Sequence, residues 1–267
     1  MHDFDALSLF AEELADCARA VALQYFRQSP PVEDKAVGGE RFNPVTAADR
    51  AIEAAWRAAI AARFPEHGVL GEEEAERIGA GSWRWVLDPI DGTSAFLTGL
   101  PTWGCLIGLY RDDAPFLGVI ELPYVAERYS GGAGKALVRD RLGRRTLAVS
   151  GCEALREARV STTDPGLFSH EERGAWDMLR RTARLTRLGL DCAAYAALAA
   201  GGLDLVVESG LKPYDIAACI PVVEGAGGFV RDWRGGPATH GGRVVAAASL
   251  PLLEEALGVL RRIPPRP

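Results

Sequence analysis

The sequence predicts a layered α/β fold, on three observations. Two stretches near the N-terminus carry the helical periodicity of apolar residues, the middle of the chain alternates short apolar runs with turn residues, and the last part alternates strand-like with helix-like segments. In a chain with this pattern, helices typically pack against sheets in layers. We therefore expect the 267 residues to form one domain with two halves, 1–145 and 146–267.

In the first half we expect a helix over residues 5–28, a loop over 29–45 that is rich in proline and glycine, and a second helix over 47–63. Thr46 is the predicted N-cap of that second helix. Apolar runs bounded by turn residues then predict four strands, over 83–87, 104–110, 116–122 and 127–130.

In the second half, strand-like and helix-like segments follow one another without a long linker. The predicted strands cover residues 159–162, 185–188, 203–208 and 243–247. The predicted helices cover residues 167–183, 192–200, 214–226 and 251–262.

Composition excludes several classes of function. Lys and Arg total 30 against 36 Asp and Glu, for a net charge of −6, and no basic run offers the phosphate neutralisation that nucleic-acid binding requires. The five cysteines are scattered without metal-ligand spacing, so we expect free thiols in a reducing compartment. Neither a secretory signal nor an apolar run long enough to span a bilayer is present. We expect a cytoplasmic protein with no nucleic-acid or membrane partner.

The segment W-V-L-D-P-I-D-G-T-S, residues 85–94, is the most informative part of the chain. A strand is expected to end at Asp88, where Pro89 and Gly92 force a turn that brings Asp88 and Asp91 to one loop with the Ile90 carbonyl between them. A short helix is expected to start at Gly92, where free N–H groups can hold a phosphate. Oxygen ligands beside an anion site suit metal-assisted phosphoryl transfer. The purely structural alternative is an Asp-Pro turn followed by an Asp N-cap.

Three further acidic segments are each ambiguous when taken alone. Gly71-Glu72-Glu73-Glu74 is by itself more typical of a solvated helix start than of a metal site. Asp49 and Asp215 each lie near the start of a predicted helix, where an acidic residue is usually a partner of the helix dipole.

Taken together, the four segments resemble the inositol monophosphatase family. The order G-E-E, then D-P-I-D-G-T, then an aromatic residue and Asp on a helix of small residues carries the resemblance, which extends from V-T-x-x-D at 45–49 to V-V-E-G-A-G-G at 222–228. It implies an αβαβα sandwich, a Mg²⁺-dependent phosphatase of small phosphomonoesters and a homodimer.

The resemblance also implies roles for individual residues. Two or three Mg²⁺ ions would be held by four carboxylates and one carbonyl, those of Glu72, Asp88, Asp91, Asp215 and Ile90. Thr93 and Asp49 would activate a water molecule as the nucleophile, with Glu73 helping to position it. The phosphate would lie on Gly92, Thr93 and Ser94.

Within the family, the chain is most similar to the histidinol-phosphate phosphatases. Tyr214 stands where inositol-type members usually have Trp, and Leu190-Asp191-Cys192 stands where they have Gly-Ser-Ala or Gly-Thr-Ala. Asp191 and Glu208 would bind the amine or imidazole of L-histidinol phosphate, since added carboxylates suit a cationic substrate. Asp191 could instead be a helix N-cap, and Glu208 could end a strand in solvent. Leu190 departs from the Gly of this branch and could narrow the pocket.

Two other functions stay open at this point. One keeps the chemistry and changes the substrate to inositol 1-phosphate or another sugar or polyol phosphate. The other is a non-catalytic binding protein on the same fold, although the complete set of expected ligands argues against it. Lys35, in the predicted loop, could reach the site or remain a solvated lysine.

Overall fold

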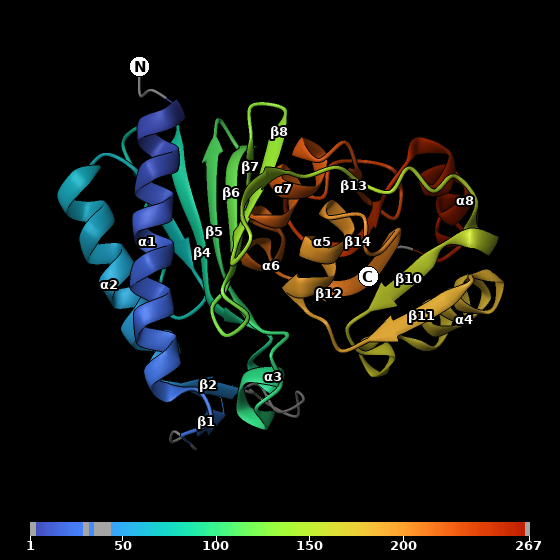
Figure 1. Cartoon of the computed structure of the whole chain (residues 1–267), viewed down its shortest axis with the longest axis horizontal. Coiled ribbons are helices and arrows are strands. Elements are labelled where there is room, and N and C mark those ends of the chain that lie inside the picture. The colour runs from blue at the N-terminus through green and yellow to red at the C-terminus, as the bar shows by residue number, and fades with distance from the viewer. Residues whose placement is uncertain (1–3, 29–31, 35–43, 265–267) are drawn as a thin grey trace.

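The molecule is built of five layers (Figure 1), and its computed structural model describes residues 4–28, 32–34 and 44–264. Helices α1 (Phe4–Tyr25) and α2 (Ala47–Arg63) cover the outer face of a seven-stranded sheet. Between this sheet and a five-stranded one lie three short helices, α5 (Cys192–Ala199), α6 (Pro213–Ala217) and α7 (Cys219–Gly225). The outer face of the second sheet is covered by α4 (His170–Thr182) and α8 (Leu250–Leu260). This αβαβα arrangement confirms the predicted fold class.

The first sheet has the strand order β3-β4-β5-β6-β7-β8-β9, in which β3 and β4 are parallel and all other neighbours are antiparallel. Three of its strands were not predicted. The β3 sequence is only G-V-L-G, and β8 and β9 carry several charges with little apolar alternation, so none gives a clear strand pattern. The strands are β3 (Gly68–Gly71), β4 (Trp83–Asp91), β5 (Gly104–Arg111), β6 (Ala114–Leu122), β7 (Glu127–Gly132), β8 (Lys135–Asp140) and β9 (Gly143–Thr146).

The second sheet has the order β11-β10-β12-β14-β13, with β10 parallel to both β11 and β12 and the other pairs antiparallel. Its strands are β10 (Arg159–Thr162), β11 (Leu185–Leu188), β12 (Leu205–Leu211), β13 (Phe229–Asp232) and β14 (Gly242–Ala247). Sequence analysis missed β13. A loop was predicted over residues 29–45, where β1 (Val32–Asp34) pairs with β2 (Pro44–Thr46) in antiparallel orientation.

Three predicted helices differ from the observed ones, and the first of them, expected over 5–28, already ends at Tyr25. The helix expected over 167–183 begins at His170, because Ser169 and Glu172 form a capping box there, and a 3₁₀ turn, η2 (Pro165–Leu167), precedes it. The helix expected over 214–226 is two helices, α6 and α7, which meet at Ala218. Pro221 has no N–H to donate to the Ala217 carbonyl four residues earlier, so a continuous helix cannot pass this point.

Three buried clusters of apolar side chains hold the layers together. One lies between the first sheet and α1 and α2, the second between the two sheets around α5 and α7, and the third between the second sheet and α4 and α8. Trp56, Trp85 and Trp176 are among the largest fully buried side chains. The third helix of the first half is the short α3 (Thr93–Thr98), which follows β4 directly and starts where the sequence predicted.

A row of glycines across the first sheet lets the middle helices approach closely. Gly108, Gly118 and Gly131 are neighbours on β5, β6 and β7. A Cβ atom at any of them would overlap the α6–α7 segment, for example the Ala218 backbone above Gly118. This contact brings α6 onto the sheet that carries β4, and the two elements together form one wall of the site.

Candidate active site

The two aspartates of the D-P-I-D segment project from one strand, β4. The strand was expected to end at Asp88 and to be followed by a turn at Pro89, but β4 continues to Asp91. Between Asp88, which pairs with Leu106, and Asp91, which pairs with Gly104, the register shifts by a bulge. A bulge accommodates a proline inside a strand and redirects side chains. Gly92, with φ of +82°, then makes the turn into α3.

Asp215 is contributed to the site by the other half of the chain. It lies on α6, which Pro213 opens at the first helical position, and its Oδ2 accepts a hydrogen bond of 2.7 Å from the Lys212 N–H. This bond fixes the orientation of the carboxylate. Oxygen atoms of Asp88, Asp91 and Asp215 all lie within 4.8 Å of one another.

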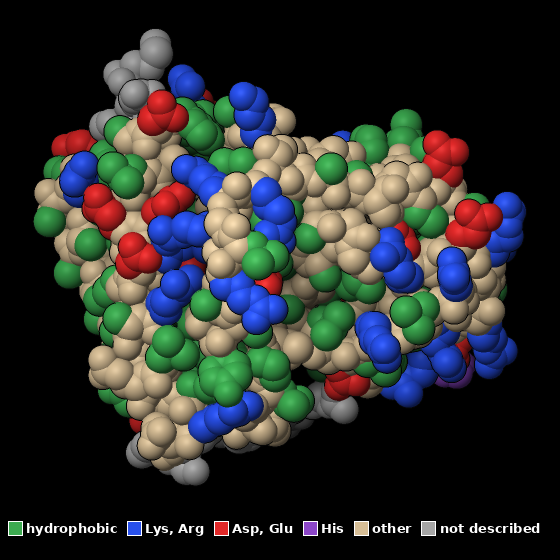
Figure 2. All heavy atoms as spheres, viewed as in Figure 1, with side chains coloured by type: hydrophobic (Ala, Val, Ile, Leu, Met, Phe, Trp, Pro, Cys, Tyr) green, Lys and Arg blue, Asp and Glu red, His purple; other side chains and the backbone are tan. Residues whose placement is uncertain are grey.

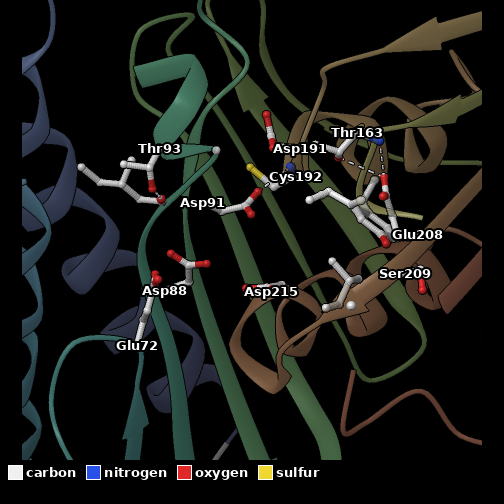
Figure 3. Close-up of a pocket in the computed structure, with 16 residues that line it drawn as sticks. Glu72, Asp88, Asp91, Thr93, Thr163, Asp191, Cys192, Glu208, Ser209 and Asp215 are labelled. Carbon is white, nitrogen blue, oxygen red and sulfur yellow. Dashed lines mark hydrogen bonds between the residues drawn. The ribbon is translucent and has the colours of Figure 1, made fainter. Parts of the chain in front are cut away.

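Glu72 joins this group from the end of β3. Figure 3 shows its carboxylate beside that of Asp88, with Asp91 and Asp215 facing the same space. The helix start considered for Glu72–Glu74 is wrong, because the segment after β3 is a series of bends. Parallel pairing of β3 with β4 sets Gly71 beside Leu87, so the residues that follow each one meet at one edge of the sheet.

The electrostatics of this carboxylate group favour a bound cation. Burial, reinforced by Glu72, Asp91 and Asp215, raises the pKa of Asp88 well above its ordinary value. Burial likewise raises the pKa of Asp91 well above normal and that of Asp215 to about 7. The Oδ1 atom of Asp88 is buried and has no hydrogen-bond partner within the part of the chain that the structure describes. Clustered carboxylate oxygens with such an orphaned acceptor fit a hard divalent ion such as Mg²⁺.

Thr46 and Asp49 form a capping box at the start of α2, which confirms Thr46 as the N-cap of this helix. The Asp49 Oδ2 accepts hydrogen bonds from the Thr46 N–H and hydroxyl, at 2.9 and 2.5 Å. Burial raises the pKa of Asp49 to about 6, although these bonds act in the opposite direction. The Thr93 hydroxyl donates to the Ile90 carbonyl at 3.1 Å, and not to Asp49. Sequence analysis expected Thr93 and Asp49 to act together, and this pairing stays a prediction.

Asp191 occupies the N-cap position of α5 but its side chain makes no capping bond. Its φ of 46° is unusual for a residue other than glycine, and its side chain lies against Gly92, where a Cβ atom would be 3.0 Å from it. Burial raises the pKa of Asp191 to about 6. The next residue, Cys192, donates its N–H to Oδ2 of Asp91 at 2.5 Å.

Glu208 is buried on β12, with 3% of its surface exposed, so the alternative of a strand end in solvent is wrong. Its Oε1 accepts hydrogen bonds from the Thr163 N–H at 2.8 Å and from the Thr163 hydroxyl at 3.0 Å, and Oε2 accepts one from Thr162 at 3.2 Å. Burial raises its pKa to about 8, against the effect of these bonds.

These residues of both halves line one cavity of about 220 Å³ (Figure 3). Nine of the predicted site residues line it: Glu72, Asp88, Ile90, Asp91, Gly92, Thr93, Asp191, Glu208 and Asp215. Asp49, Glu73 and Ser94 are not among its lining residues, and Ser94 is exposed on α3. Leu190 packs against the central core and does not line the cavity, while Lys35 lies outside the described residues.

Several lining residues were missed by sequence analysis. Thr163 directly follows β10, and the parallel register that pairs Ser161 with Val206 of β12 brings it beside Glu208. Tyr195, on α5, has a buried hydroxyl without a hydrogen-bond partner among the described residues. Its place in a run of alanines gave no signal beyond helical periodicity.

Comparison with known proteins assigns the family. The model of the inositol monophosphatase family matches residues 3–263, nearly the whole chain. The chain belongs to this family. Its members are metal-dependent phosphatases, and the carboxylates of Asp88, Asp91 and Asp215 form a group that could hold the metal.

Relatives within the family carry two kinds of name. The bifunctional phosphatase IMPL2, chloroplastic, of Arabidopsis thaliana is 41% identical over 87% of the chain, which spans 66% of that relative's length. A histidinol-phosphatase of Chlorobaculum parvum is 36% identical over 84% of the chain and 85% of its own length. The solved structure of an inositol monophosphatase from Zymomonas mobilis matches with a TM-score of 0.85 and 38% identity, over 98% of this chain and 100% of that one.

No helix among the described residues is both long and apolar enough to cross a membrane.

Proposed function

We propose that this phosphatase is Mg²⁺-dependent and hydrolyses L-histidinol phosphate to L-histidinol and phosphate. The observation that carries the proposal is the acidic character of both ends of the cavity: Asp88 and its neighbours lie at one end, and the buried Glu208 lies at the other (Figure 3). The first end suits metal ions with a phosphate, and the second suits a cation. The relatives named histidinol-phosphatase support this choice of substrate.

The metal ions would be held by four carboxylates, of Glu72, Asp88, Asp91 and Asp215, and by the Ile90 carbonyl. Four ionised carboxylates carry a charge of about −4, which two Mg²⁺ ions balance, so that a phosphate dianion is accepted rather than repelled. When bound, Mg²⁺ supplies Lewis acidity and lowers the pKa of water. Two or three ions are expected.

The remaining chemistry belongs to side chains near the start of α2 and α3. Thr93, after turning its hydroxyl away from the Ile90 carbonyl, would orient the attacking water, and Asp49 would accept the proton. A pKa near 6 suits Asp49 to that role at neutral pH. Glu73 would help to position the water, and the N–H groups of Gly92, Thr93 and Ser94 would hold the phosphate.

The substrate's ammonium or imidazolium group would be bound by Asp191 and Glu208. Binding of a cation favours the ionised form of a carboxyl group, so the raised pKa of Glu208 would fall in the complex. Thr162 and Thr163 already donate to this carboxyl group, which prepares it to be ionised. An uncharged polyol would lack this interaction.

Inositol 1-phosphate, or another sugar or polyol phosphate, is the second candidate substrate. The 38% identity with the inositol monophosphatase from Zymomonas mobilis favours it. We further propose that residues 1–145 and 146–267 act as one catalytic unit, since both line the cavity, and that the protein works in the cytoplasm as a homodimer.

Phosphate release from L-histidinol phosphate tests the proposal. The wild type should release phosphate with Mg²⁺, and the rate should vanish with a chelator and return when Mg²⁺ is restored. Asp91→Asn, which removes one ligand charge, should stay inactive under all three conditions. Release that is insensitive to chelation, or an Asp91→Asn variant as active as the wild type, would contradict the metal mechanism.

A further inference from the structure

Glu53 is a buried acidic residue on α2 that lies against the segment following β3. None of its side-chain surface is exposed, and its carboxylate accepts two backbone hydrogen bonds from the segment that follows β3. The Glu73 N–H donates to Oε2 at 2.8 Å, and the Glu74 N–H donates to Oε1 at 3.1 Å. A single carboxylate thus holds the backbone of the turn that carries Glu72 and Glu73.

Arg57 completes this attachment from the next turn of the helix. Its Nε donates to Oε1 of Glu53 at 2.8 Å, and its Nη2 donates to the Glu74 carbonyl at 2.9 Å. The turn is therefore held by two backbone N–H donors, of Glu73 and Glu74, and by one backbone acceptor, the Glu74 carbonyl. Glu53 and Arg57 form an ion pair at 2.8 Å, so Arg57 offsets the charge of Glu53 beside the acidic cluster.

The spacing of residues on α2 links this attachment to the active site. Asp49, Glu53 and Arg57 follow one another at intervals of four and share one face of the helix. Gly71 lies directly against this face, where a Cβ atom would overlap the Glu53 carboxylate. One rigid helix thus sets the position of Asp49 and of the Glu72–Glu74 turn relative to each other.

We infer that Glu53 is a positioning residue of the metal centre, which fixes the Glu72–Glu74 turn so that Glu72 faces Asp88. The inference rests on the proposed function in one respect, the role of Glu72 as a Mg²⁺ ligand. Partners that orient metal ligands from behind typically change metal affinity by about 10- to 100-fold when removed. Glu53→Gln keeps the size of the side chain but turns one acceptor oxygen into a donor, which cannot bind a backbone N–H.

Mg²⁺ binding by calorimetry, on the full chain without substrate, tests this inference. Glu53→Gln should weaken Mg²⁺ binding by at least about 10-fold, and the Mg²⁺ concentration for half-maximal phosphate release should rise by a similar factor. Glu121→Gln is the matched control. Glu121 is equally buried and bound to arginines, at 2.5 Å from Arg128, but it lies in the α1–β6 contact away from the cavity.

The expected outcome is a loss of thermal stability in both variants and a loss of Mg²⁺ affinity in Glu53→Gln alone. Equal Mg²⁺ affinity in the wild type and Glu53→Gln would overturn the inference and leave Glu53 a purely structural residue. If Glu53→Gln does not fold, Glu53→Asp is measured in its place. Its shorter side chain keeps the charge, but its carboxylate lies too far from the turn. Unchanged Mg²⁺ affinity in Glu53→Asp would equally overturn the inference.

The same measurement separates this inference from the proposed function. A wild type that binds Mg²⁺ but releases no phosphate would contradict the function, while the comparison with Glu53→Gln would still decide on the positioning role. A wild type that binds no Mg²⁺ would contradict both.

Discussion

The Cys192 N–H donates a 2.5 Å hydrogen bond to the carboxylate of Asp91, 101 residues away in the sequence. Asp91 ends β4 in the first half of the chain, and Cys192 begins α5 in the second. The acidic cluster is therefore completed by the packing of the two halves, which also supplies Asp215. Changes at the contact between the halves should consequently alter metal binding as well as stability.

Mg²⁺ should stabilise the protein against unfolding through the acidic cluster. At a free concentration 100 times the dissociation constant, a ligand of the folded state adds about 2.7 kcal/mol to the free energy of unfolding. Asp88→Asn should lose most of this gain, whereas Asp177→Asn, on the outer helix α4, should keep it. Thermal unfolding with and without Mg²⁺ measures the effect. Equal stabilisation of all three proteins would place the Mg²⁺ site elsewhere.

Asp49→Asn should lower kcat by about 10²- to 10⁴-fold, the usual contribution of a general base. The asparagine oxygen can still accept the Thr46 hydrogen bonds that cap α2, so the fold should be kept. Steady-state kinetics at saturating Mg²⁺ should show KM changed by only a few-fold. A large rise in KM with unchanged kcat would mean that Asp49 binds the substrate and does not accept the proton.

The buried Glu208 should make stability depend on pH. Its pKa is raised from 4.5 to about 8, so between these values the folded state keeps a proton that the unfolded state has lost. Rising pH therefore destabilises the fold, by up to about 1.4 kcal/mol per pH unit within this window. Glu208→Gln lacks the titrating group and should gain stability relative to the wild type from pH 5 to pH 8. Urea unfolding without Mg²⁺ measures this, and a constant difference between the two proteins would show that Glu208 titrates normally.

Gly118→Ala should disturb the close contact between the first sheet and α6–α7. The added Cβ would overlap the Ala218 backbone, three residues after Asp215, and overpacking of this kind costs about 1–3 kcal/mol. Mg²⁺ binding should weaken too, because α6 carries Asp215. Gly174→Ala is the matched control, since its Cβ would meet nothing and alanine favours the α4 helix. Equal Mg²⁺ affinity in both variants would show that Asp215 tolerates a displaced α6.

Local patterns predicted the fold class and the pair Asp88 and Asp91, whereas Glu72 and Asp215 were expected at the site only through the resemblance to the inositol monophosphatase family. The D-P-I-D-G-T segment places two aspartates and a helix start within six residues, and the α2 cap needs only Thr46 and its neighbours. Strand β3 was not predicted, since two of its four residues are glycines and its partner β4 starts twelve residues after β3 ends. Its parallel pairing with β4 is what brings Glu72 beside Asp88.

Contacts between distant segments could not be predicted, because they depend on how the whole chain folds and not on the local sequence. Glu53 has the sequence context of an exposed helical residue with an i,i+4 arginine partner, and only the fold shows that its carboxylate holds the turn after β3. The bulge in β4 replaced an expected turn, because pairing with β5 keeps the strand extended through Pro89. The burial of Glu208 likewise depends on a distant segment, since Thr162 at the end of β10 and the following Thr163 donate hydrogen bonds to its carboxylate.

The ratio of kcat/KM for L-histidinol phosphate to that for inositol 1-phosphate, measured with Mg²⁺ in the wild type and in Glu208→Gln, tests the central claim most directly. The account predicts a large preference for L-histidinol phosphate, reduced in Glu208→Gln through loss of the cation contact while the rate with inositol 1-phosphate stays nearly constant. A preference of the wild type for inositol 1-phosphate would contradict the assignment of the substrate and leave only the metal mechanism standing.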